Sequence, residues 1–197
     1  PIHQGHLTID GSNAGVILDG SGFPGDWNPG LQIVASSANT IRGLQISNFS
    51  GRAIDISGDS EHNVIGGDRT IGAGPHGQGN LLSGNGNGII MSLDGTSLNV
   101  IAGNLIGTDA AGAAALGNAA NGIWIGEGAN QNTIGPDNVI AHSGADGIVV
   151  QHEGSLHNTI TQNSIHDNGS LGIGLWEGGN SELVAPVILE FDLAAGT

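Results

Sequence analysis

Three residue types are missing from this chain of 197 residues, namely cysteine, lysine and tyrosine. Without cysteine there is neither a disulfide framework nor a thiolate metal site. Only three basic residues, Arg42, Arg52 and Arg69, oppose 18 acidic ones, so the net charge is −15. This balance excludes nucleic acid as a partner, because such binding needs cationic side chains that replace phosphate counterions. It also disfavours polyanionic ligands, except where metal cations bridge the two negative surfaces.

Aromatic residues and long apolar runs are scarce as well. Aromatic residues make up 3% of the chain, so the hydrophobic core must be aliphatic. No segment approaches the roughly 20 apolar residues of a membrane-spanning helix, so we expect no membrane span. Glycine is abundant, with 37 residues. Together with frequent Asn, Ile and Val it predicts many short strands joined by tight turns, because Gly and Asn tolerate left-handed backbone conformations.

Short motifs recur along the chain, and their repetition is the most informative feature of the sequence. The first motif is Asn followed by Thr or Val and then Ile, at residues 39–41, 63–65, 99–101, 132–134 and 158–160. A second apolar segment beginning with Asn follows in four cycles, at residues 80–82, 104–106, 138–140 and 163–165. Each cycle closes with a segment similar to Gly-Ile-x-Ile, at residues 53–56, 88–91, 122–125, 147–150 and 172–175. Units this small must stack on their neighbours to bury a core.

The spacing of the closing motif defines one coil of a solenoid. Gly122, Gly147 and Gly172 are 25 residues apart, which fits three short strands and three turns. Earlier cycles are longer, and their extra residues lie in the loops 66–79 and 107–118, at corners where insertion leaves the stacked core intact. The sequence therefore predicts an all-β, parallel β-helix of about six coils with three short strands per coil. The chirality of parallel crossovers makes it right-handed.

The expected domain organisation is a single β-helix domain at residues 1–178. Within it, residues 1–30 should form an irregular first coil and residues 31–178 the regular coils. Residues 179–197 should form a C-terminal tail with an apolar capping strand at 184–191. Because the first residues lack the basic and apolar regions of a signal peptide, we expect the chain to be a module of a longer protein with other domains.

Alternation within the closing strands predicts which side chains form the core. Residues 54 and 56 and their counterparts 89/91, 123/125, 148/150 and 173/175 should point inward, and the residue between each pair outward. The recurrent Asn residues should stack into ladders of side-chain amides, since adjacent coils lie about 4.8 Å apart. Their expected role is structural.

Several strings in the chain resemble a bacterial right-handed parallel β-helix repeat family. They are Asn-Val-Ile-Ala-Gly-Asn-Leu-Ile-Gly-Thr-Asp (99–109), Leu-Gly-Asn (116–118), Asn-Gly-Ile (121–123) and Asn-Thr-Ile-Gly (132–135). The resemblance extends from about residue 7 to residue 176. It implies a right-handed solenoid outside the cell or on its surface, often directed at carbohydrate. It implies no single activity, because the same architecture carries pectate lyases, glycoside hydrolases, epimerases, adhesins and spacers.

The outward side of the closing strands is the best candidate for a ligand-binding surface. Its positions in successive coils are Asp55, Ile90, Trp124, Val149 and Gly174, and the 25-residue period aligns Glu127, His152 and Glu177 just past the strands. Trp124 and Trp176 belong to coils two apart, hence about 10 Å apart along the axis, close to the length of a disaccharide in an extended β-linked glycan. Indole faces stack on sugar rings and carboxylates accept sugar hydroxyls. The candidate ligand-binding residues for a polysaccharide or cell-surface glycan are therefore Trp124, Trp176, Asp55, Glu127 and Glu177.

An alternative is that Trp124 packs under a loop and Trp176 caps the last coil. The same column also offers catalytic candidates in Glu127, His152 and Glu177. The two Glu residues would lie about 10 Å apart, at or beyond the upper edge of the range for inverting glycosidases. His152 between them could tune their pKa values or bind a metal with them.

Other residues are candidates for a metal site. His142 and the neighbouring pair His166 and Asp167 lie in consecutive coils near one corner, and Asp109 lies in a turn that could supply oxygen ligands for calcium. The sequence fixes no cofactor, and calcium is the one that it suggests.

No complete catalytic set can be assembled from these residues. The lyases that share the architecture use a Lys or Arg base or a Tyr and His pair, and Lys and Tyr are absent here. We therefore expect an extracellular or cell-surface module that binds polysaccharide or is structural. The alternative is a polysaccharide-degrading enzyme, a glycoside hydrolase rather than a lyase.

Overall fold

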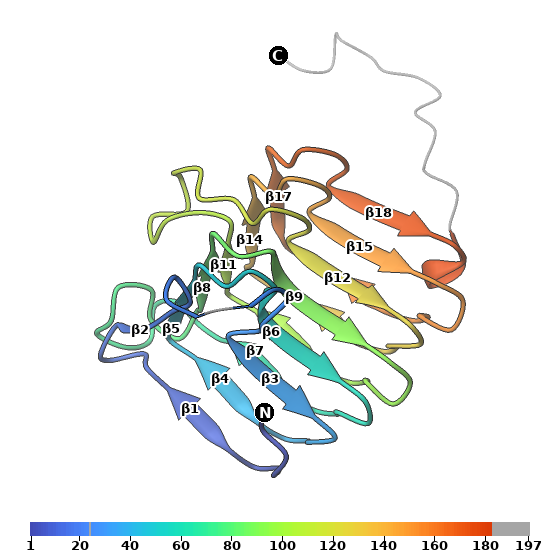
Figure 1. Cartoon of the computed structure of the whole chain (residues 1–197), viewed down its shortest axis with the longest axis horizontal. Helices are drawn as coiled ribbons and strands as arrows, with labels where there is room; N and C mark the ends of the chain where they lie inside the picture. Colours follow the sequence, from blue (N-terminus) through green and yellow to red (C-terminus); the bar gives the residue numbers. More distant parts are fainter. Residues whose placement is uncertain (24, 183–197) are drawn as a thin grey trace, which may run out of the picture.

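The structure, a computed structural model that describes residues 1–23 and 25–182, is a solenoid of three parallel sheets (Figure 1). Each sheet has six strands, and successive strands of the chain pass from one sheet to the next. Every coil therefore contributes one strand to each sheet, which gives six coils. The predicted all-β architecture and coil number are confirmed.

The three sheets contain strands of two to six residues. The first sheet consists of β1 (Thr8–Asp10), β4 (Thr40–Arg42), β7 (Val64–Gly66), β10 (Val100–Ala102), β13 (Thr133–Ile134) and β16 (Thr159–Ile160). The second consists of β2 (Val16–Asp19), β5 (Leu44–Ser47), β8 (Leu81–Ser83), β11 (Leu105–Ile106), β14 (Val139–Ala141) and β17 (Ser164–His166). The third consists of β3 (Leu31–Val34), β6 (Arg52–Ser57), β9 (Asn87–Ser92), β12 (Ile123–Gly126), β15 (Ile148–Gln151) and β18 (Ile173–Trp176). A 3₁₀ segment, η1 (Gly179–Glu182), follows β18. In the described part of the chain, no helix has the length and hydropathy needed to cross a membrane.

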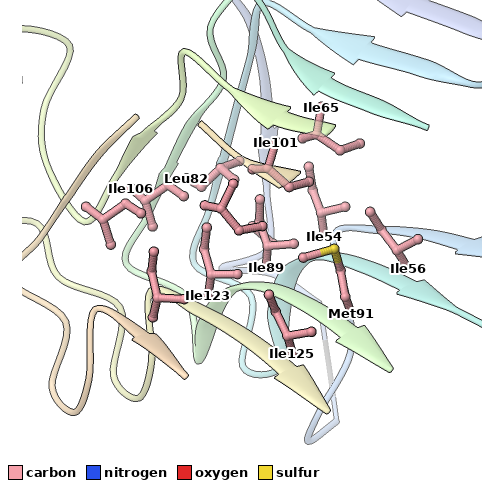
Figure 2. Packing of buried hydrophobic residues seen from close by; sticks show 14 of the residues in the cluster. Ile54, Ile56, Ile65, Leu82, Ile89, Met91, Ile101, Ile106, Ile123 and Ile125 are labelled. Atoms are coloured by element: carbon pink, nitrogen blue, oxygen red, sulfur yellow. The ribbon is translucent and has the colours of Figure 1, made fainter. Parts of the chain in front are cut away.

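The core is a column of aliphatic side chains between the three sheets. Ile54, Ile89 and Ile123 occupy the same register position in β6, β9 and β12, and all three are fully buried. Figure 2 shows them beside Met91 and the side chains that the other two sheets contribute. Each fully buried Ile stabilises the fold by roughly 1.5–3 kcal/mol relative to an exposed one. The predicted inward positions are confirmed, and Ile173 differs only in being 45% exposed, because it belongs to the last coil.

The first residues of the chain already pair with the coil that follows them. Residues 1–30, expected as an irregular first coil, contain β1 and β2, which pair in register with β4 and β5. Residues 20–23 and 25–30, between β2 and β3, contain no strand. The expected capping strand at 184–191 lies outside the described residues.

Asparagine ladders satisfy the polar groups of the backbone at the corners. The first ladder contains Asn39, Asn63, Asn99, Asn132, Asn158 and Asn180. In it the side-chain oxygen of each Asn accepts from the backbone N–H of the Asn in the preceding coil, at distances of 2.9–3.0 Å. A second ladder runs through Asn80, Asn104, Asn138 and Asn163. Buried backbone groups without partners would be costly, so these rungs are a condition for stacking the coils.

Removing a central rung should destabilise the fold strongly. The Asn99 side chain bonds Asn132 Oδ1 and Ser60 O, both at 2.9 Å, and accepts from Asn63. We expect Asn99→Ala to lower the free energy of unfolding by about 3–5 kcal/mol, because it leaves several buried groups unpaired. The half-buried terminal rung Asn163→Ala should cost about 1 kcal/mol. Urea unfolding followed by tryptophan fluorescence measures both, and equal losses would contradict the role assigned to the ladder.

The loop between β7 and β8 folds back over the corner that follows β1. Gly74 N donates to the carbonyl oxygen of Ser12 at 2.7 Å, and Ala73 N donates to Asn13 Oδ1 at 3.0 Å. His76 of this loop is only 4% exposed, and neither of its ring nitrogens has a hydrogen-bond partner. Burial lowers the pKa of His76 below its ordinary value of 6.5, against a smaller opposing effect of the Leu44 main chain. The loop is therefore packed around a neutral imidazole.

Stability should fall as His76 becomes protonated. Below pH 6.5 the unfolded chain binds the proton that folded His76 excludes, so stability is full above pH 6.5 and declines as the pH falls toward the lowered pKa. We expect His76→Leu to remove part of the stability loss between about pH 7 and pH 5. The control His62→Asn, at an exposed position, should leave it unchanged. Urea midpoints across this range measure the effect, and parallel pH profiles of wild type and His76→Leu would contradict the prediction.

Candidate functional site

Two tryptophans project from the outward face of the third sheet. The strand register defines two outward columns, the first with Gln32, Asp55, Ile90, Trp124, Val149 and Gly174 and the second with Val34, Ser57, Ser92, Gly126, Gln151 and Trp176. Trp124 lies in the first column on β12 and Trp176 in the second on β18. β15 lies between these strands (Figure 1), so the two residues are two coils apart, as the 25-residue period predicts.

Each indole lies over a glycine of its own strand. A Cβ on Gly126 would collide with the six-membered ring of Trp124, and a Cβ on Gly174 would collide with Nε1 of Trp176. The two glycines thus leave room for the rings to lie close to the sheet surface. Each Trp occupies one column and its glycine the other, so the two rings extend across the sheet in opposite directions.

Both indole N–H groups donate to residues of the coil between them. Trp124 Nε1 donates to Oε1 of Gln151 at 3.0 Å, at the end of β15. Trp176 Nε1 donates to Oδ2 of Asp146 at 3.2 Å, just before β15 begins. These bonds fix the direction of both rings, because a tryptophan N–H is a donor only and has one favoured line of approach.

Asp146 is both a rung of a ladder and an anchor. Asn87, Asn121 and Asp146 occupy equivalent positions in three successive coils. In each case the side-chain Oδ1 accepts from the backbone N–H at the same position of the next coil, and for Asp146 the donor is Leu171 N at 2.8 Å. The side chain of Asp146 is only 6% exposed. Burial alone would raise the pKa of Asp146, but hydrogen bonds from Ser170, Leu171 and Trp176 outweigh burial and lower it. Asp146 is therefore ionised at neutral pH.

These residues surround an open cavity of about 360 Å³, lined by Asn121, Trp124, Asp146, Val149, Gln151, Trp176 and Glu177. We call this set the indole site. Glu177 Oε2 accepts from Gln151 Nε2 at 3.0 Å and lies 3.1 Å from Nε2 of His152. The His152 ring in turn meets Trp124 edge to face, with 5.9 Å between ring centroids. The cavity thus brings together two indoles, two carboxylates and two amides.

The indole site contains only some of the residues that the sequence suggested. Trp124, Trp176 and Glu177 line the cavity, and His152 touches Trp124 and Glu177. Glu127 is exposed and does not line it. Asp55 keeps its outward position but is only 2% exposed, because Arg52 Nη2 and Gln32 Nε2 hold its Oδ2 at 3.0 and 2.8 Å. Oδ2 of Asp55 is therefore occupied by protein partners, and Oδ1 is buried without a hydrogen-bond partner, so the carboxylate is not exposed to a ligand.

The candidate metal ligands form smaller contacts. The rings of His142 and His166 meet edge to face with centroids 6.0 Å apart, and Nδ1 of His166 lies 2.8 Å from Asp167 Oδ2. Asp109 Oδ1 accepts from the backbone of its own loop, at Ala113 N and Ala114 N, which lowers the pKa of Asp109. Within residues 1–23 and 25–182, no group of three or more His, Asp or Glu residues is placed to hold a metal ion.

Sequence reasoning missed Asp146 and Gln151. The residue before the closing Gly is Asn in two coils and Asp at position 146, so the change from Asn to Asp within an aligned column was a detectable difference. Gln151 offered no such cue. Its role depends on the direction in which the Trp124 ring turns.

Fold and comparison together define the class of this molecule. A family model described as a right-handed beta helix region matches residues 114–189, which cover the last coils and the indole site. The chain is a right-handed parallel β-helix. No curated protein and no solved structure gives a significant match.

A substitution at Asp146 should break its hydrogen bond with Trp176 Nε1 and keep its bond with Leu171 N. We expect Asp146→Asn to keep the ladder bond to Leu171 but to face the Trp176 N–H with its amide nitrogen, a donor that cannot accept from the indole. With Trp27 and Trp124 changed to Phe, Trp176 is the sole fluorophore, and its emission should shift to the red and its quenching by acrylamide should rise. Asp137→Asn, an exposed position outside the indole site, is the control. Unchanged emission in Asp146→Asn would show that this bond does not hold the ring.

Proposed function

We propose that this β-helix is a polysaccharide-binding module, with the glycan lying across β12, β15 and β18 at the indole site. The observation that carries the proposal is the pair of indoles held over glycines on both sides of one cavity. Trp176 is 46% exposed although a bond to a buried carboxylate fixes its direction. A large aromatic side chain that is both exposed and oriented is typical of a binding surface rather than of packing.

The spacing of the rings suits an extended carbohydrate chain. Strands of a parallel sheet are about 4.8 Å apart, so β12 and β18 are separated by about 10 Å along the solenoid axis. This is close to the length of one disaccharide in an extended β-linked glycan. The two rings would then stack on two sugars that are separated by one sugar between them. Gln151, Asp146 and Glu177 between the rings offer polar atoms for sugar hydroxyls. Few groups need to move, which keeps the entropic cost of binding low.

Two observations on the carboxylates favour binding over hydrolysis. The pKa of Asp146 is lowered, so this residue is not suited to be the protonated acid of a glycosidase. Glu127, the other carboxylate suggested by the repeat, does not line the cavity. The proposal places the module outside the cell or on its surface, where polysaccharides are encountered, and in a longer parent protein with other domains.

Removing the rings should weaken glycan binding strongly. On a glycan array, we expect the wild-type chain to bind extended β-linked polysaccharides and the double variant Trp124→Ala/Trp176→Ala to lose at least about tenfold in affinity. Trp27→Ala is the matched control, because Trp27 is exposed in the loop before β3 and does not line the cavity. A reducing-sugar assay with and without calcium runs in parallel.

Two results would contradict this proposal. Equal binding by the wild-type chain and the double variant would remove the indole site from recognition. Release of reducing ends that is lost in Glu177→Gln would identify a hydrolase in place of a binding module.

A further inference from the structure

The charged side chains that line the indole site are both acidic, and an imidazole lies beside one of them. Asp146 and Glu177 are carboxylates of the cavity lining. The chain has no lysine, and its three arginines, Arg42, Arg52 and Arg69, belong to the second and third coils. Among the described residues, His152 contacts the site through Glu177 and Trp124. A ligand that enters the cavity therefore meets negative charge without a fixed positive counter-charge.

Asp146 contributes a charge that is held in place. Its oxygens are fixed by Leu171 N at 2.8 Å and Trp176 Nε1 at 3.2 Å, and its side chain is nine-tenths buried. Partial burial strengthens its field, because low-dielectric surroundings screen charges less than water does. An uncharged Asn occupies the equivalent position in the two preceding coils and makes the same kind of ladder bond. Stacking of the coils therefore does not require the charge.

Glu177 supplies a second negative charge at the rim. Its Oε2 is held by Gln151 and His152, and the side chain as a whole is 62% exposed. The two indoles line the same cavity as these carboxylates, and indole faces attract cations through their negative π surfaces. Aromatic rings combined with carboxylates are the chemistry that recognises an ammonium group.

We propose that the indole site selects glycans that carry primary amines, such as chains of β-linked glucosamine. The inference rests on the proposed function, since it assumes that a glycan lies across the rings. The ammonium group of one sugar lies against an indole face and next to Asp146 or Glu177, while the sugar rings stack as in a neutral glycan. Uronate-containing chains are rejected by the same carboxylates.

The test compares oligosaccharides with the same sugar backbone, one with free amino groups and one with N-acetylated amino groups. By titration calorimetry near pH 6, we expect a glucosamine hexamer to bind about tenfold more tightly than an N-acetylglucosamine hexamer, the size expected of a partly desolvated cation–π contact with a carboxylate. This preference should shrink as salt is raised from about 0.05 M to about 0.5 M, because exposed charges are screened. The quantity to follow is the ratio of the two dissociation constants.

Two variants separate recognition at the site from general attraction to an acidic protein. Glu177→Gln and Glu127→Gln change the net charge by the same amount, but only Glu177 lines the cavity. We expect Glu177→Gln to move the ratio toward one and Glu127→Gln to leave it near ten. Thermal unfolding of both variants verifies that they are folded.

Each contrary outcome has a distinct meaning. Equal affinity for the two hexamers overturns the selection for amines and leaves the proposed function intact. A ratio that falls equally in both variants assigns the preference to the overall charge and overturns the inference as well. Binding of no hexamer, with no effect of the tryptophan substitutions on any glycan, overturns the proposed function itself.

Discussion

The solenoid depends on one requirement, which is that the backbone amides at its buried corners find partners away from water. Short strands leave many such groups, and an unpaired one costs roughly 1–3 kcal/mol. The Asn ladders meet this requirement because each side chain both accepts from one coil and donates within the stack. They also fix the register, since a rung works only when equivalent residues lie directly above one another. Every other feature of the molecule, including the indole site, rests on that register.

Asp146 shows how a rung can acquire a second role. Only its Oδ1 is needed by the ladder, where it accepts from Leu171. In an Asn the other atom would be a donor and would oppose the N–H of Trp176, whereas the carboxylate accepts it. Both roles use hydrogen bonds, and these are what keep the buried carboxylate ionised despite its burial. The Asn ladder thus supplies the site with a fixed negative charge, because one of its positions carries a carboxylate in place of an amide.

The sequence predicted the frame better than the site for a physical reason. The strand positions, the inward residues and the column of Glu127, His152 and Glu177 follow from a period that the backbone must obey. The direction of a long side chain does not follow from the period, because it depends on χ angles and on a specific partner. Asp55 has the outward position predicted for it, but Arg52 and Gln32 bury its carboxylate. Glu127 and Glu177 occupy equivalent positions, and only the latter lines the cavity and is held by Gln151.

Several residues of the indole site differ from the repeat consensus, and these differences depend on one another. A single Trp on an outward position could be incidental, as could a Gly in a strand or an Asp in place of Asn. Here each ring requires its own glycine, Gly126 or Gly174, and the second ring requires the carboxylate of Asp146. A glycine in the strand alone would weaken the sheet, because it gives up side-chain packing. A buried carboxylate in place of Asn alone would also be unfavourable, because burial of its charge needs hydrogen-bond donors to offset it. The combination stabilises an arrangement that leaves aromatic surface exposed to solvent. Packing of the core gains nothing from that exposure, which favours a role in recognition for these residues.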